Sequence, residues 1–110
     1  MKGKISSPGN YVDGTPRFEI GIYPDESLLN DIHIDVRNAI KLKIGPLIYT
    51  AGINSTEKAG MWIAPDIYDF TGNCEKLRLS EVLIKKGLKK NQEIELNYNT
   101  ESKLIEILGL

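Results

Sequence analysis

Regular alternation of apolar and polar residues is the feature of this sequence that most constrains its fold. Apolar side chains occupy every second position in residues 18–23, 31–37, 40–44 and 93–98. Successive side chains of a strand point to opposite faces, so this pattern predicts strands that each bury one face. Further short strands are expected at residues 47–51, 61–64, 67–70 and 104–108, with Thr71-Gly72-Asn73 ending the third of these. Many short strands without alternating helices predict an all-β or β-rich α+β fold, a small barrel or pseudobarrel of seven to eight strands.

One short helix is expected near residues 80–86. Ser80 is the predicted N-cap, because its hydroxyl can accept a hydrogen bond from a free backbone N–H. Gly87 can adopt a positive φ just after the last turn, and Leu88 can then pack back on Leu83. This is the arrangement of a Schellman motif, which ends many helices.

The clearest alternation covers residues 31–37 and 40–44, and the polar break between them predicts a hairpin. Residues 24–30 are expected to connect two strands, with one helical turn at 27–29. The segments 7–17 and 52–60 are rich in glycine and polar residues and are expected to be loops.

The predicted hairpin would place Asp31, His33 and Asp35 on one strand face. These are metal-ligand residue types, and His33 is the only histidine of the chain. Asp35 would also lie opposite Lys41, and His33 near Lys43. Charge pairing across a solvated face therefore explains the pattern without a metal, and it is the interpretation we prefer.

Length and composition place the chain among ordinary globular domains. At 110 residues with a net charge of −1, it is expected to form a single domain, residues 1–110, with no overall attraction to nucleic acid or membranes. It lacks the run of ~20 apolar residues that a membrane span needs. One cysteine, Cys74, and an N-terminus without the apolar stretch of a signal peptide favour the cytoplasm.

Catalytic and cofactor motifs are weak in this sequence. Asp13-Gly14-Thr15 does not have the residue order of the aspartic proteases, and Cys74 has no histidine near it in the sequence. Neither a phosphate-binding glycine-rich loop nor a dinucleotide-binding pattern occurs. We therefore expect no catalytic residue, no metal and no cofactor.

The candidate binding residues are polar or basic side chains on the two predicted loops and at the end of the predicted helix. Such side chains can contact phosphates and base edges if a barrel brings the loops to one side as two arms. The set is Arg17, Asn54, Ser55, Thr56, Lys58, Lys85 and Lys86.

The C-terminal third carries a resemblance to a known family. A short helix is followed by Gly87-Leu88-Lys89-Lys90-Asn91-Gln92 and then by the strand-like Glu93-Ile94-Glu95-Leu96. This resembles the B-three-type DNA-binding pseudobarrel of plant transcription factors and restriction-enzyme recognition domains, whose members have Gly-Asp where this chain has Asn91-Gln92. Asn91 also tolerates the left-handed conformation that this turn needs. The resemblance implies double-stranded DNA bound in the major groove by two loop arms.

Three functions follow from these observations. The leading hypothesis is a non-catalytic DNA-recognition module, in keeping with a restriction or defence system. The alternative is a protein-interaction or assembly barrel with a protein partner. A near-neutral charge and free strand edges suit this function. The third is a small hydrolase that uses Asp31, His33 or Asp69. None of the three requires a membrane.

Overall fold

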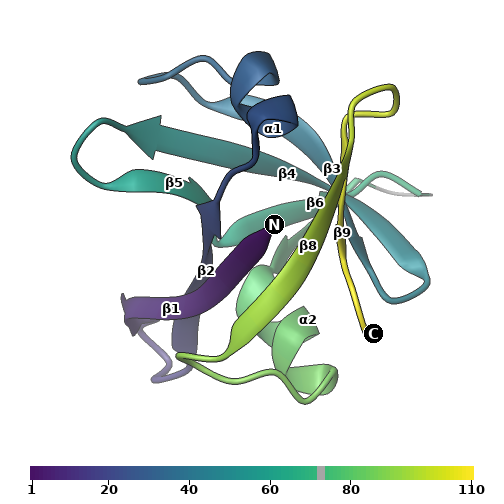
Figure 1. Cartoon of the computed structure of the whole chain (residues 1–110). Helices are drawn as coiled ribbons and strands as arrows, with labels where there is room; N and C mark the ends of the chain where they lie inside the picture. Colours follow the sequence, from purple (N-terminus) through teal and green to yellow (C-terminus); the bar gives the residue numbers. More distant parts are fainter. Residues whose placement is uncertain (72–73) are drawn as a thin grey trace.

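The computed structural model describes residues 1–71 and 74–110, and this part of the chain forms nine strands and two short helices (Figure 1). In chain order the elements are β1 (Lys2–Asn10), β2 (Pro16–Tyr23), α1 (Glu26–Asp31), β3 (Asn38–Ile44), β4 (Leu47–Thr56), β5 (Gly60–Ile63), β6 (Asp66–Asp69), β7 (Glu75–Arg78), α2 (Leu79–Lys85), β8 (Glu93–Asn99) and β9 (Leu104–Ile107). Gly72 and Asn73, in the predicted end of the strand at 67–70, lie outside the described residues.

Seven of the strands close into a barrel, which confirms the predicted fold class. Around the ring the order is β3, β9, β8, β1, β2, β5, β4 and back to β3. β3 and β9 pair in parallel, and the other neighbours in the ring pair antiparallel. The β6–β7 hairpin joins the sheet through β6, which pairs with β4 at Thr50.

The predicted alternation points its apolar residues into the barrel. Phe18, Ile20 and Ile22 on β2 are each at most 5% exposed, as are the leucine and the two isoleucines of β3. Burial at this level in every strand of the ring produces one continuous core, to which α2 adds Leu79 and Leu83. Burial of apolar surface is the main force that closes the sheet.

The end of α2 is the predicted Schellman motif. Gly87 has φ +79°. Its N–H donates to the Ile84 carbonyl at 2.9 Å, and the Leu88 N–H donates to the Leu83 carbonyl at 3.0 Å. Leu83 and Leu88 are both buried in the core, so the helix end is fixed by hydrogen bonds and by packing.

The start of α2 differs from the prediction. The helix begins at Leu79 with Arg78 at the N-cap position and without a side-chain capping bond. Ser80 lies one residue inside the helix and is 1% exposed. The predicted cap was wrong because tertiary burial of Leu79, whose N–H donates to the Pro65 carbonyl, sets where the helix starts.

The predicted strand at residues 31–37 is also wrong. Asp31 is the last residue of α1, whose N-cap Asp25 accepts a hydrogen bond from the Leu28 N–H at 3.1 Å. The following residues form a bend in which Ile34 and Val36 are about half exposed. Asp31, His33 and Asp35 therefore do not share a strand face, and the expected pairing with Lys41 and Lys43 does not form, since β3 pairs with β4 and β9.

The segments 7–17 and 52–60 are mostly strand rather than loop. β1 and β2 extend through the first segment to a turn at residues 11–15, and β4 and β5 extend through the second to a turn at 57–59. Most of the backbone in both segments is extended and paired, so the two segments form the ends of the β1–β2 and β4–β5 hairpins. Glycine and polar residues at hairpin ends explain why they resemble loops in the sequence.

Candidate nucleic-acid interface

The two turns predicted to act as arms lie at opposite ends of β2. Pro16, at one end of β2, adjoins the β1–β2 turn, whereas Ile22, near the other end, pairs with Met61 beside the β4–β5 turn. The strand between them is eight residues long, a span of about 23 Å at ~3.3 Å per residue. Figure 1 shows the two turns well apart. The prediction that they form two arms on one side of the barrel is therefore wrong.

One end of the barrel, called here the α2 end, consists of α2, the β1–β2 turn and the β3–β4 turn. The other, the α1 end, consists of α1, the β4–β5 turn and the β8–β9 turn. Figure 1 shows α2 at the bottom of the barrel and α1 at the top. Each predicted site residue belongs to one of these two ends.

The α2 end carries a lysine cluster. Its members are exposed and make no ion pair within the part of the chain that the structure describes: Lys85, Lys86, Lys89 and Lys90. They face outward because Leu79, Leu83 and Leu88 use the opposite side of α2 and its turn to fill the core. Lys85 also lies in the last helical turn, where the helix dipole favours a positive charge.

An apolar hollow accompanies the lysine cluster. A shallow pocket of about 290 Å³ lies between β2 and the end of α2, and its lining includes Phe18, Ile84, Leu88, Lys89 and Lys90. Arg17, the neighbour of Phe18, is exposed near the same end of β2. The structure thus places Arg17, Lys85 and Lys86 at the same end of the barrel.

The other predicted residues lie at the α1 end. Lys58 is exposed in the β4–β5 turn, and Asn54 is half-buried on β4. The Thr56 hydroxyl accepts a hydrogen bond from the Ala59 N–H at 2.8 Å and so helps to form the turn. Ser55 is buried, with its side chain toward the interior. As placed here, Ser55 does not present its hydroxyl to a base edge.

The β1–β2 turn is held by a contact that the sequence does not reveal. The Arg78 guanidinium donates to the Asp13 carboxylate at 2.8 Å and to the Thr15 hydroxyl at 2.9 Å. It also lies 3.8 Å from the centre of the Tyr11 ring, as a cation–π contact. Hydrogen bonds from the Thr15 hydroxyl and then from Arg78 lower the pKa of Asp13 to about 2. More than sixty residues separate Arg78 from these partners, so no local pattern predicts the contact.

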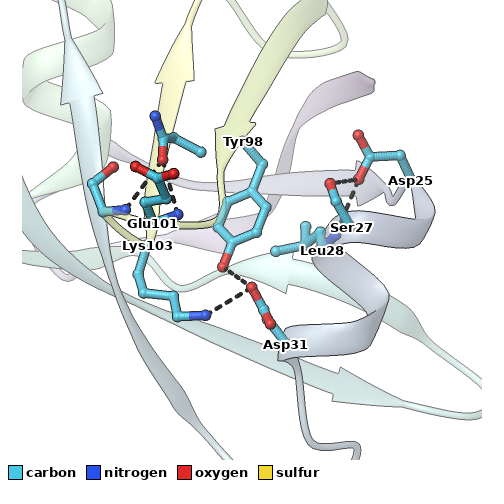
Figure 2. A network of polar contacts seen from close by, with 9 residues as sticks. Asp25, Ser27, Leu28, Asp31, Tyr98, Glu101 and Lys103 are labelled. Atoms are coloured by element: carbon cyan, nitrogen blue, oxygen red, sulfur yellow. Dashed lines mark hydrogen bonds and ion pairs between the residues drawn. The ribbon is translucent and has the colours of Figure 1, made fainter.

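A second polar network joins α1 to the β8–β9 hairpin (Figure 2). The Tyr98 hydroxyl donates to Asp31 Oδ2 at 2.6 Å, and Lys103 Nζ lies 2.9 Å from the same oxygen. Hydrogen bonds from Tyr98 and Lys103 lower the pKa of Asp31. Burial, followed by the hydrogen bond to Asp31, raises the pKa of Tyr98 to about 12.

These contacts weaken the hydrolase hypothesis. Asp31 is engaged by Tyr98 and Lys103, and Asp69 accepts two hydrogen bonds from Thr71, which lower its pKa. A general base needs a pKa near the working pH, and neither carboxylate has one. Within residues 1–71 and 74–110, no three His, Cys, Asp or Glu side chains are grouped so that they could hold a metal ion.

Comparisons of the chain with protein-family models, with curated proteins and with solved structures find no match. Neither of the two helices in the described residues has the length and apolar character needed to cross a membrane. The described residues form a small closed β-barrel with a cluster of exposed lysines at one end.

Proposed function

We propose that this protein is a cytoplasmic, non-catalytic DNA-recognition module that contacts the phosphate backbone of a duplex with its α2 end. The lysine cluster is the observation that carries the proposal. Four exposed ammonium groups occur within six residues, and none is neutralised by an ion pair in the described structure. Phosphate contacts by such side chains supply most of the affinity of non-specific DNA binding.

Because the whole chain is nearly neutral, the proposal requires that one particular part of the surface binds DNA. With 14 basic and 15 acidic residues, the molecule has no general attraction to DNA. Binding must therefore come from a local group of cations. The resemblance of residues 79–96 to the B-three-type pseudobarrel adds a role in a restriction or defence system to the proposal.

A salt-dependent titration tests the proposal. Fluorescence anisotropy with a labelled mixed-sequence duplex would be measured at several salt concentrations for the wild type and for Lys85→Gln/Lys86→Gln. Each lost phosphate contact lowers the slope of log affinity against log salt by about 0.9. The double variant is therefore expected to lower the slope by up to about 2 and to bind more weakly at low salt.

The matched control is Lys41→Gln/Lys58→Gln, which removes the same charge from exposed positions on β3 and in the β4–β5 turn. It is expected to keep the wild-type slope. Undetectable binding of the wild type at low salt would overturn the proposal. So would equal losses in the two double variants, because net charge alone would then explain them.

A protein-interaction module is the second candidate function. The α1 end exposes four large apolar side chains, each about half exposed or more: Tyr23, Leu29, Ile34 and Val36. Exposed apolar groups in one region are typical of protein-binding surfaces. Sedimentation equilibrium over a range of concentrations would reveal self-association. If the protein is a monomer at all concentrations, self-assembly is excluded and only binding to a different protein is left for this candidate.

A further inference from the structure

A pocket at the α1 end is lined mainly by apolar side chains. It has a volume of about 490 Å³ and lies between the end of β2, the β4–β5 turn, α1 and the bend that follows α1. Its apolar lining includes Ile22, Tyr23, Leu29, Ile34 and Met61. Pockets of this size and character are typical of small-molecule sites.

A buried hydroxyl without a partner forms part of this lining. Ser55 is 6% exposed, and its Oγ has no hydrogen-bond partner in the described part of the chain. The strand register places Ser55 opposite Met61, and both side chains are buried and line the pocket. Burying a hydroxyl costs free energy unless it forms a hydrogen bond, so a ligand group that bonds to Ser55 would recover that cost.

The charges around the pocket restrict the ligand. Among the described lining residues, Glu57 is the only one with a carboxylate or an ammonium group, and it is exposed at the rim. No buried cation is there to hold an anion, and the apolar walls disfavour any charged group. A neutral ligand therefore fits the lining best.

The strands around the pocket also disfavour an extended peptide. β5 lies between β2 and β4 and pairs with both. Among the described strands that border the pocket, none has a free edge for a peptide backbone to join, so strand addition cannot supply affinity.

We infer that this pocket binds a neutral, mainly apolar small molecule through one hydrogen bond to the Ser55 hydroxyl. This site goes beyond the proposed DNA-recognition function and lies at the other end of the barrel. Its ligand needs an aromatic or branched aliphatic body and one donor or acceptor that bonds to Ser55 Oγ once the Ser55 side chain has turned toward the pocket, because this oxygen is almost closed off from solvent in the free protein.

The test uses N-phenyl-1-naphthylamine, a neutral fluorescent probe with an apolar body and one N–H donor. Titration into the wild-type protein is expected to give a saturable fluorescence increase with one site per chain. Ser55→Ala removes only the hydroxyl and is expected to weaken binding about twofold to tenfold, which is the range of one net hydrogen bond. Thermal unfolding of Ser55→Ala should show no loss of stability, because the hydroxyl has no partner in the free protein.

Two further variants locate the binding. Ala59→Trp fills the exposed rim of the pocket and is expected to abolish saturable binding. Leu47→Ser removes an exposed apolar side chain that does not line the pocket, and it is expected to bind as the wild type does. The inference is overturned if the wild type gives no saturable signal, if Ser55→Ala binds as tightly as the wild type, or if Ala59→Trp leaves binding unchanged.

Discussion

The hydrogen bond between Tyr98 and Asp31 offers the sharpest test of how the α1 end is held. Tyr98 is buried on β8, and its hydroxyl is the group that links this strand to α1 (Figure 2). A hydrogen bond to a charged partner contributes about 1.5–3 kcal/mol. The Asp31 side chain is 24% exposed, so water can replace part of the bond. We therefore expect Tyr98→Phe to lower the free energy of unfolding by about 1.5 kcal/mol.

Urea unfolding at pH 7 measures this loss. Tyr23→Phe is the matched control, because the same atom is removed from a side chain that is 64% exposed. The control should change the free energy of unfolding by less than about 0.5 kcal/mol. Equal effects of the two substitutions would refute the reasoning, since the Tyr98 hydroxyl would then contribute no more than an exposed one.

The difference in the free energy of unfolding between wild type and Tyr98→Phe should become smaller at both low and high pH. The folded pKa of Asp31 is lowered, so its contribution is present above the ordinary carboxyl pKa and is lost as the pH falls through the folded value. The folded pKa of Tyr98 is raised to about 12, so its contribution is present below pH ~10 and is lost as the pH rises toward 12. The difference should therefore be largest between about pH 5 and pH 10.

Three other measurements address the remaining contacts. Leu83→Ala should lower the free energy of unfolding by about 2–5 kcal/mol, because Leu83 is fully buried; a loss below 1 kcal/mol in urea unfolding would contradict its place in the core. Gly87→Ala should cost about 1 kcal/mol in the same assay, because Gly87 has a positive φ, and a neutral effect would argue against this helix end. Carbon-13 NMR titration of Asp13 should give a pKa of about 2 that rises in Arg78→Ala, and an unchanged value would mean that Arg78 does not reach the carboxylate.

Local patterns in the sequence were enough to predict the barrel class and the helix end. Alternation predicted the inward faces of β2 and β3, because burial on one side of a strand imposes a period of two. The positions of Gly87 and Leu88 predicted the Schellman motif, because its two hydrogen bonds join residues close in sequence.

The failures have a common physical cause, since each depends on tertiary contacts. Residues 31–37 alternate as a strand does, but α1 ends at Asp31 and the following bend leaves Ile34 exposed. Ser80 has the side chain of an N-cap, yet the burial of Leu79 starts the helix one residue earlier. Propensity is a weak guide where packing decides.

The candidate site was predicted in part for the same reason. Lys85 and Lys86 lie close together in sequence and at one end of the barrel. Whether Lys58 lies near them depends on the strand register, which a single sequence does not reveal. The register places the β4–β5 turn, with Lys58, at the opposite end of β2. The link from Arg78 to Asp13 likewise depends on contacts between distant segments.

Nitrogen-15 NMR titration with an unlabelled mixed-sequence duplex at low salt tests the central claim most directly. The account predicts that amide signals of residues 85–90 and of Arg17 shift progressively, while those of residues 54–58 stay in place. Shifts confined to residues 54–58, or an unchanged spectrum at low salt, would contradict DNA binding by the α2 end of this barrel.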